Sequence, residues 1–526
     1  MKQLPTGIQN IKEILSDNFV YVDKTDFAYK LIKGGKYYFM SRPRRFGKSL
    51  FVSTLGEIFE GNRELFKGLA IYNSDYQWEP YPVLRFDFSR IPSRTPEEFE
   101  NALKRKLRNL ASAHNLSIEV PTIEEGLEAL IENLSKKAKV VILVDEYDKP
   151  IIDNLEQLGI AEGNRQLLKN TFRAVKSLDE NIKFAFITGV SKFSQVSIFS
   201  GLNNLKDITM IDQYANMMGY TEGEVKKEFK EHIQQIVNNR LELGQNTNSS
   251  EIVNEIRLWY NGYRFSKARS TVYNPFSTLN FMESGDMEGY WYSSGTPSFL
   301  IEQIKRAPQS VVPLSGATAS KSDLMDISQI DQIDLVAIMF QTGYLTIQDY
   351  STSGLCRLDF PNEEVRQAFM SSLVKCFTDI TPGKITKYQK LFLSCDLEAI
   401  FGKIQSFFAS FPYHLFTNAS EATYHGMLLA ILKGMGLDVQ AECFTNLGRT
   451  DLILKTEKIV YIFECKLDKS TGQALAQIED RKYYEQYTHQ GKEIGVVGIN
   501  FSSQDRNISD WQGRLLSPSG EFIREF

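Results

Sequence analysis

A glycine-lysine-serine loop near the N-terminus lies between two segments of different pattern. The β-prone run 36–40 precedes it, and residues 49–60 after it have the apolar spacing of an amphipathic helix. Further along, Val140–Val144 form an uninterrupted apolar run that ends in Asp145 and Glu146. Such a run is typical of a parallel strand whose sheet is covered by helices on both faces. Further strands are predicted at 82–88 and 184–189, and further helices at 96–114 and 164–176.

Strands that alternate with helices predict a doubly wound α/β domain with its ligand at the carboxyl ends of the strands. The loop and the two acids fall at such ends, and they are the groups that a nucleoside triphosphate requires. Lys48 is expected to neutralise the β- and γ-phosphates, and Ser49 with Asp145 to hold Mg²⁺. Glu146 is expected to orient the attacking water as general base. Thr188 lies at the end of a neighbouring strand. Its hydroxyl is expected either to hydrogen-bond that water or the γ-phosphate, or to cap the backbone at the strand end.

The loop departs from the usual phosphate loop at its first position, where Arg42 replaces glycine in G-x-x-x-x-G-K-[ST]. Arg44 and Arg45 either contact phosphate or face solvent. Asp148 is interpreted as an acid at a helix start before Pro150, and not as a metal ligand. The predicted ATP contacts are Arg44, Arg45, Phe46, Gly47, Lys48, Ser49, Asp145 and Thr188.

A set of motifs across residues 4–280 resembles the AAA-ATPase-like domain of a bacterial protein family. The motifs are Tyr21–Thr25, Arg42–Ser49, Val144–Asp148, Thr188–Phe193, Phe199–Asn204, Trp259–Tyr263 and Tyr273–Phe276. The Arg-Pro-Arg-Arg form of the loop is normal in that family, so the resemblance implies an ATP site despite Arg42. We assign residues 1–215 to this P-loop domain.

The middle of the chain is expected to form a lid and a connector. Residues 216–305 are predicted to be a helical lid, in which Arg264 is either a γ-phosphate sensor or a surface arginine. Residues 306–410 are predicted to be a connector, either winged-helix-like or a plain link, with a β-hairpin between 344 and 360. Its first part, 306–323, is rich in Pro, Ser, Ala and Gly and is interpreted as a linker or loop.

Two acids and a lysine are predicted to converge on a C-terminal β-hairpin formed by 448–454 and 459–466. Alternation along a strand puts Glu464 and Lys466 on one face, and the hairpin turns Asp451 back toward Glu464. Carboxylates in this arrangement suit hard Mg²⁺ or Mn²⁺. The chemistry predicted is metal-assisted phosphodiester cleavage, with Lys466 positioning the nucleophile or balancing charge. The alternative is a surface hairpin with an ion pair.

Residues 411–526 resemble the PD-(D/E)XK nuclease-like domain that follows the same ATPase-like domain. The likeness rests on Gly448–Asp451, Glu464–Lys466, the helical segment 470–478 and an expected final strand at 494–501. It implies a third acid at the start of a helix over 421–432. The implied active-site positions are Glu421, Asp451, Glu464, Lys466 and Gln477, with Glu421, Asp451 and Glu464 as metal ligands.

Three other features admit two interpretations each. His425 either supports Glu421 or lies on the helix surface. Tyr483, Tyr484 and Tyr487 either stack on bases or pack a helix. The net charge of −5 means that any contact with nucleic acid must be local. The run 104–108 (Lys-Arg-Lys-Leu-Arg) is either such a nucleic-acid patch or a solvated helix face, and we favour the solvated face because a basic run on an amphipathic helix is more often solvated.

The whole-chain composition suits a multidomain globular protein of 526 residues. No apolar run is long enough for a membrane span, no secretory signal is recognisable, and the five scattered cysteines favour a cytoplasmic protein. We expect an ATPase fused to a magnesium-dependent nuclease that acts on nucleic acid, with DNA favoured over RNA, and that is able to form homo-oligomers. The alternatives are a nucleotide-dependent signalling or defence switch whose nuclease-like domain binds without cutting, a degenerate scaffold, and a small-molecule kinase.

Overall fold

The computed structural model describes most of the chain. The residues it describes are 1–192, 198–199, 202, 204–293, 317–325, 334–351, 354–378, 380, 382–445, 448–488 and 490–526. The chain divides into two compact units, one comprising 1–294 with 319–357 and the other 295–318 with 358–526. The four-part division expected from the sequence stays a prediction. No helix of the described residues is both long and apolar enough to cross a membrane.

A five-stranded parallel sheet forms the core of the first unit. Its strands are β1 (Tyr37–Ser41), β2 (Val83–Asp87), β3 (Val140–Asp145), β4 (Ile182–Gly189) and β5 (Lys206–Asp207), in the order β2-β3-β4-β1-β5. Every residue of β1 and β3 is buried, as their apolar sequences predict. β4 lies between the loop-bearing strand β1 and the acid-bearing strand β3. The expected α/β class is therefore confirmed.

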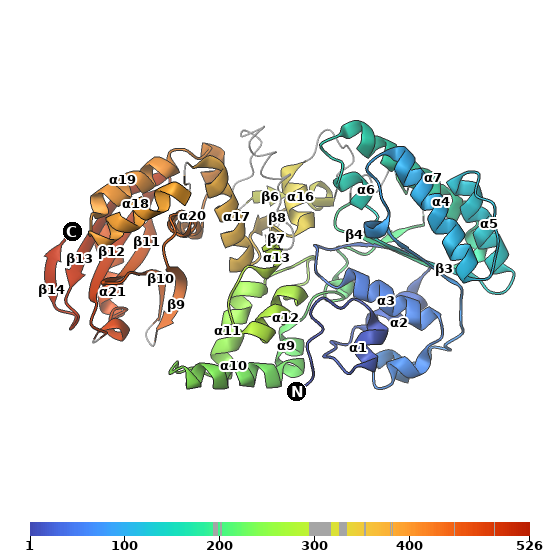
Figure 1. Cartoon of the computed structure of the whole chain (residues 1–526), viewed down its shortest axis with the longest axis horizontal. Coiled ribbons are helices and arrows are strands. Elements are labelled where there is room, and N and C mark those ends of the chain that lie inside the picture. Colours follow the sequence, from blue (N-terminus) through green and yellow to red (C-terminus); the bar gives the residue numbers. More distant parts are fainter. Residues whose placement is uncertain are drawn as a thin grey trace. The chain divides into compact units, whose positions relative to one another are not determined.

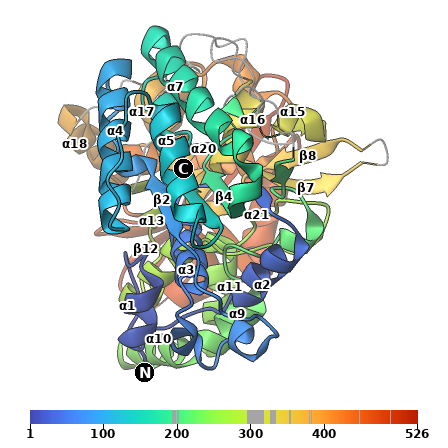
Figure 2. The ribbon, with the colours of Figure 1, turned by 90° about the vertical axis from the view of Figure 1, so that its right-hand side faces the viewer.

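Helices cover both faces of this sheet (Figure 1). On one face lie α1 (Ile11–Ser16), α2 (Thr25–Gly34) and α3 (Lys48–Phe59), and on the other α4 (Pro96–Ala113), α5 (Ile123–Ser135) and α7 (Leu158–Ser177). Figure 2 shows α4, α5 and α7 packed side by side. Thr95 caps α4 by accepting from Glu98 N, with proline in the first turn, which is a favoured helix start. A short helix, α6 (Lys149–Ile152), follows β3.

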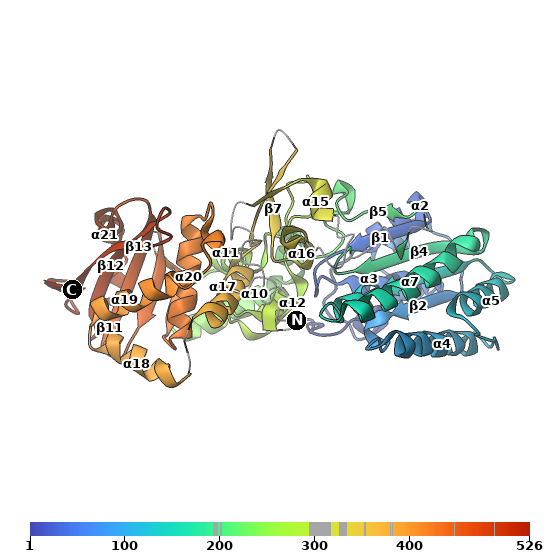
Figure 3. The same ribbon diagram turned by 90° about the horizontal axis from the view of Figure 1, so that it is seen from above.

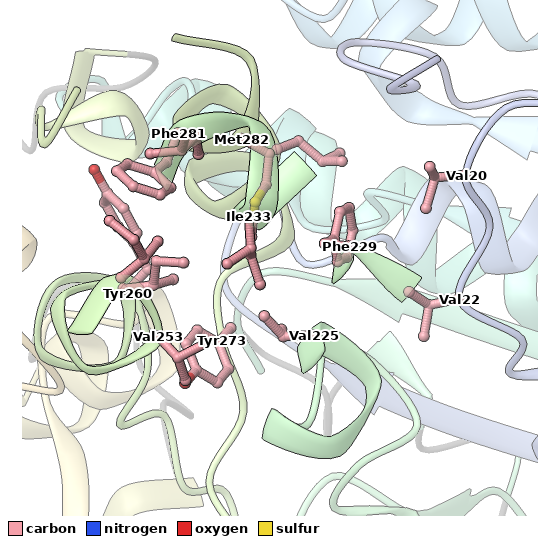
Figure 4. Close-up of a cluster of buried hydrophobic side chains, with 14 of the residues drawn as sticks. Val20, Val22, Val225, Phe229, Ile233, Val253, Tyr260, Tyr273, Phe281 and Met282 are labelled. Carbon is pink, nitrogen blue, oxygen red and sulfur yellow. The ribbon is translucent and has the colours of Figure 1, made fainter. Parts of the chain in front are cut away.

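The expected lid segment is helical over most of its length. Its helices are α9 (Glu222–Glu228), α10 (Lys230–Glu242), α11 (Ser249–Tyr260), α12 (Pro275–Ser284) and α13 (Tyr290–Ser293). Their apolar faces enclose one buried cluster that also takes in Val20 and Val22 from the N-terminal segment (Figure 4). The N-terminal segment is thereby packed against the lid helices.

Arg264 is not the surface arginine that was one of its two interpretations. Its side chain is buried, and its guanidinium donates to the backbone carbonyls of Ser266, Ala268, Lys267 and Gln348. All five donors of an arginine are directional, so this set of carbonyls holds it as a structural brace. The surface interpretation is therefore wrong, because the side chain is buried and each of its three nitrogens donates to a backbone carbonyl.

The described residues between 317 and 360 are ordered into short elements. They are β6 (Ala317–Ala319), α15 (Lys321–Met325), α16 (Leu335–Thr342), β7 (Thr346–Tyr350) and β8 (Cys356–Asp359). β7 and β8 are hydrogen-bonded neighbours, which confirms the expected hairpin. Of the segment interpreted as a linker, 306–316 lies outside the described residues, whereas 317–323 belongs to β6 and α15.

The second unit is built on a mixed six-stranded sheet. Its strands are β9 (Val439–Thr445), β10 (Gly448–Lys455), β11 (Ile459–Leu467), β12 (Glu493–Ser502), β13 (Asn507–Leu516) and β14 (Phe522–Glu525), in the order β14-β13-β12-β11-β10-β9. β11 and β12 are parallel, and the other neighbours are antiparallel. The strand expected to be the last, at 494–501, is β12, so that expectation is wrong by two strands.

Helices lie on both faces of this second sheet as well. They are α17 (Glu363–Phe377), α18 (Pro382–Leu393), α19 (Leu397–Phe408), α20 (Glu421–Gly434) and α21 (Thr471–Asp480). Figure 3 shows α21 on one face and α19 and α20 on the other. This α/β/α arrangement is the one expected for the C-terminal domain.

Candidate nucleotide and metal sites

The phosphate loop runs from β1 into α3 and turns on Gly47. Gly47 has φ +87°, a left-handed conformation that glycine adopts without strain. The Lys48 ammonium folds back over the loop and donates to the carbonyls of Arg42 (3.0 Å) and Pro43 (2.9 Å). Burial lowers the pKa of Lys48, against the opposing pull of Asp145. A phosphate placed over the α3 N-terminus would meet a helix dipole and a nearby ammonium.

Arg42, the residue in the position of the first glycine, points away from the loop. Its guanidinium is buried, donates to the carbonyls of Ser41 (2.9 Å) and Thr209 (2.8 Å), and lies 4.1 Å from the ring centre of Phe265. The side chain therefore fills a slot in the domain core and leaves the phosphate side of the loop open. This placement explains how an arginine is accommodated where glycine is usual.

Asp145 ends β3 beside the first turn of α3. It accepts a hydrogen bond from Ser49, and burial raises its pKa to about 6. Its Oδ1 is buried and has no hydrogen-bond donor among the described residues. A buried carboxylate oxygen without a donor is costly unless a cation completes it. Asp145 and Ser49 thus fit a magnesium ion.

The two other predicted catalytic groups lie close to this pair in the chain fold. Glu146 has φ +51°, which is uncommon for a residue other than glycine, and it lines a cavity beside the loop. Thr188 precedes the last residue of β4 and is buried, and its hydroxyl donates to the Met40 carbonyl at 2.7 Å. The backbone-capping interpretation of Thr188 matches this bond.

A cavity of about 320 Å³ opens over the loop. Lys48, Ser49, Glu146 and Lys149 are among its lining residues, and apolar residues of the N-terminal segment and of α12 also line it. This volume is in the range of pockets that hold small ligands. Arg45 lies over the Phe276 ring, 4.6 Å from its centre. Arg44 is exposed. A lining that combines charged and apolar groups suits a ligand with phosphates and a base.

Asp148 lies at the start of α6, as expected, but its side chain has a role that the sequence did not predict. It makes no side-chain cap to α6. Instead its buried carboxylate accepts from the Val190 amide (3.1 Å) and from the amide and hydroxyl of Ser191 (both 2.7 Å). It therefore fastens the segment after β3 to the segment after β4, which keeps the acids of β3 in register with the end of β4.

Asp148→Ala is expected to lower the free energy of unfolding by about 3 kcal/mol, because two buried amides lose a charged acceptor. The measurement is the urea midpoint, followed by circular dichroism. Asp153→Ala is the matched control, since Asp153 ends the same helix and only pairs with Lys149 across an (i,i+4) spacing. Equal midpoints for the two variants would contradict the bracing role.

In the second unit, Asp451, Glu464 and Lys466 share the sheet face that α21 covers. Strand alternation puts them on the same side as Ile453 and Ile462, which pack against α21. Asp451 accepts from the Cys465 amide at 2.7 Å, and Lys466 donates to Glu464 at 2.8 Å. The expected convergence of two acids and a lysine is thus present in the geometry.

Glu464 has an unusual environment for a carboxylate. Its side chain is 1% exposed, and its Oε2 has no hydrogen-bond donor among the described residues. Burial and the neighbouring charge of Asp451 raise its pKa to about 7, although Lys466 opposes the shift. The same signature marks Asp145 in the first unit. A divalent cation next to Glu464 would offset the repulsion between Glu464 and Asp451 and would give Oε2 a partner.

Glu421 begins α20 and reaches the end of β11. It accepts from the Leu467 amide at 3.1 Å, and the Lys469 ammonium lies 3.9 Å away. Within the described residues no three His, Cys, Asp or Glu side chains are arranged closely enough to hold a metal ion. Metal ligation by Glu421, Asp451 and Glu464 together therefore stays a prediction. Gln477 is half-buried on α21.

His425 was expected on the helix surface or in support of Glu421, and it does neither. It is buried, and its Nε2 lies 2.9 Å from the carbonyl oxygen of Asp451. It thus ties α20 to the strand that carries Asp451. Tyr483 and Tyr487 are buried in the α21 cluster, which favours the packing interpretation.

These two units define a class: a protein with an N-terminal P-loop domain and a nuclease-like C-terminal domain. A family model described as "Predicted AAA-ATPase" matches residues 5–199, and one described as "PD-(D/E)XK nuclease superfamily" matches residues 419–511. The chain is 35% identical to an "Uncharacterized protein in vnfD 5'region" of Azotobacter chroococcum mcd 1, over 96% of this chain and 98% of that protein. No solved structure matches significantly. The chain belongs to the family of AAA-ATPase-like proteins with a C-terminal PD-(D/E)XK nuclease-like domain.

Proposed function

We propose that this protein binds and hydrolyses ATP in its first unit and cleaves phosphodiester bonds of nucleic acid in its second. One observation supports both halves of the proposal. In each unit a buried carboxylate, Asp145 or Glu464, has a raised pKa, an oxygen without a donor among the described residues, and a lysine nearby. That combination is suited to a divalent cation next to a phosphate.

In the first unit, Lys48 would exchange its two loop carbonyls for phosphate oxygens. Ser49 and Asp145 would hold the magnesium ion that accompanies ATP, and the cation supplies charge neutralisation to the β- and γ-phosphates. Glu146 would accept a proton from the attacking water. Phosphoryl transfer needs mainly positioning and electrostatic stabilisation, and these residues supply both.

In the second unit, Asp451 and Glu464 would hold Mg²⁺ or Mn²⁺, with Glu421 as a third ligand. The cation, when bound, lowers the pKa of a water molecule and stabilises charge on the phosphate. Lys466 would position that water or balance the charge of the acids. Gln477, on the helix that covers the same sheet face, would contact the nucleic acid.

The proposed partner is nucleic acid, with DNA favoured, and the proposed setting is the cytoplasm, which the scattered cysteines support. We also infer that the chain is able to form homo-oligomers. The rival is a nucleotide-dependent switch whose nuclease-like domain binds nucleic acid without cutting it. The two proposals differ in one measurable quantity, the rate of strand cleavage.

The test measures phosphate release from γ-labelled ATP, and strand cleavage, with the full chain. Both are measured with no polymer, with DNA and with RNA, in Mg²⁺ and in Mn²⁺. We expect ATP turnover to rise with one polymer and that polymer to be cut. Turnover without cleavage in either metal would favour the switch, and absence of both activities would refute the proposal.

A further inference from the structure

A second cavity, of about 530 Å³, adjoins the nucleotide cavity. It lies between the first turns of α3, the carboxyl end of β2 and α4, which runs beside β2 (Figure 2). Gln9 and Ser49 line both cavities, and Asp145 lines the second one. The second cavity therefore opens onto the pair of side chains that fits magnesium.

Two cations of this cavity are available to a ligand, namely Arg105 and Lys106 of α4. In the described part of the chain, neither has a carboxylate within ion-pair distance. The two other arginines of the lining are engaged: Arg90 pairs with Asp87 at 3.0 Å, and Arg85 pairs with Glu60 at 2.9 Å. The lining thus has an uncompensated positive charge on its α4 side.

Lys106 is half-buried, and burial lowers its pKa, against the opposing charge of Asp87. A half-buried ammonium that makes no direct ion pair gains from an anionic ligand. The solvated helix face predicted for the basic run 104–108 matches Arg105 and Arg108, which are exposed, and Lys104 pairs with Glu100 at 2.8 Å. Lys106 is only half-buried, and both Arg105 and Lys106 line the cavity.

The rest of the cavity wall is partly apolar, since buried Val52, Phe86 and Ile91 contribute to it. A mixed lining of this volume is typical of sites for small organic ligands. An inorganic ion alone would leave the apolar wall without contacts. Cationic groups at one side and apolar groups at the other suit a phosphate attached to an organic body.

We propose that this cavity binds a terminal phosphate monoester, held by Arg105 and Lys106, with its organic body against the apolar wall. The source of the monoester is either a mononucleotide or the 5′ end of a nucleic-acid strand. Because the two cavities share Ser49, a ligand here lies next to the predicted magnesium pair and is placed to influence ATP turnover. This site is additional to the ATP and nuclease sites of the proposed function.

The test is calorimetric titration of the full chain, with and without a non-hydrolysable ATP analogue. The probes are thymidine 5′-monophosphate and 5′-phosphorylated trithymidylate, each compared with its form that lacks the 5′-phosphate. Removing two charged contacts in Arg105→Gln/Lys106→Gln is expected to weaken binding of the phosphorylated probe at least about tenfold. Lys104→Gln/Arg108→Gln is the matched control, because it removes the same charge from the same helix outside the cavity.

Binding of the mononucleotide alone would identify a small-molecule ligand. Tighter binding of the trinucleotide than of the mononucleotide would identify the end of a nucleic-acid strand. Both results support the site. Equal weakening in the two double variants would show a nonspecific charge effect and overturn it. Equal affinity for probes with and without phosphate, or no binding of any probe to the wild type, would also overturn it. Unchanged affinity for the ATP analogue in both variants keeps this result separate from the ATP site.

Discussion

Lys48→Ala is expected to reduce ATP turnover by roughly 100- to 1,000-fold, the usual loss when one preorganised donor to a developing charge is removed. Two neutral carbonyls, those of Arg42 and Pro43, hold the Lys48 ammonium in place. It can exchange them for phosphate oxygens without breaking an ion pair. The measurement is release of labelled phosphate at saturating Mg-ATP.

Lys149→Ala is the matched control for this prediction. Lys149 lines the same cavity, but it pairs with Asp153 at 2.9 Å and lies on α6, outside the loop. We expect its removal to change turnover by less than about threefold, the effect of an exposed ion pair. If Lys48→Ala retained wild-type turnover with an unchanged circular dichroism spectrum, the loop would not be the phosphate site.

The strand-loop-helix framework of the first unit was predictable because local patterns determine it. The apolar run of β3 and the spacing in α3 are properties of short segments. Helix α5 was missed, although Thr122 followed by Glu125 is a cap signal and apolar residues recur at helical spacing through Leu134. That signal was sufficient to find it.

The hydrogen-bond partners of individual side chains were less predictable than the helices and strands that carry them. Arg42 is held by Thr209, and Asp148 by Val190 and Ser191, partners that lie far along the sequence. Likewise His425 meets the backbone of Asp451 only after α20 packs on the sheet. A sequence shows which groups are present, whereas these long-range contacts arise from the tertiary fold.

The C-terminal hairpin was predictable in both its strands and its shared face, since alternation places Glu464 and Lys466 together. The last two strands were missed. In β13 the alternation of buried and exposed residues is broken by a bulge, where the register with β12 shifts between Asn500 and Phe501. In β14 every residue is exposed. A short, fully exposed edge strand has no burial pattern that would reveal it.

Glu464→Gln is expected to reduce metal-dependent cleavage by at least about 100-fold and to weaken Mn²⁺ binding. The amide keeps the shape of the side chain but removes the charge that ligates a hard cation. Glu457→Gln is the matched control, because Glu457 lies exposed in the turn of the same hairpin. Cleavage by Glu464→Gln at the rate of that control would remove Glu464 from the metal site.

Because the pKa of Glu464 is raised, the affinity of the site for a metal ion is expected to depend on pH, and the direction of that dependence can be stated. In the metal-free protein this pKa is about 7, so below that pH a cation must displace a proton to bind. We expect Mn²⁺ affinity to fall by about tenfold per pH unit below about 7 and to level off above it. Calorimetry across this range measures the slope, which is expected to be shallower in Glu464→Gln.

The raised pKa of Glu464 also provides a way to tell whether Glu464→Gln loses activity because metal ligation is lost or because the protein unfolds. Between pH 4.5 and about 7 the native carboxyl binds more protons than the unfolded one, so its contribution to the free energy of unfolding falls as pH rises. Glu464→Gln removes that contribution, and its stability relative to wild type is expected to increase over this range. If Glu464→Gln becomes more stable relative to wild type as pH rises while its cleavage rate stays low, the loss of activity is due to the metal site. A parallel decline in stability would instead attribute the loss to unfolding.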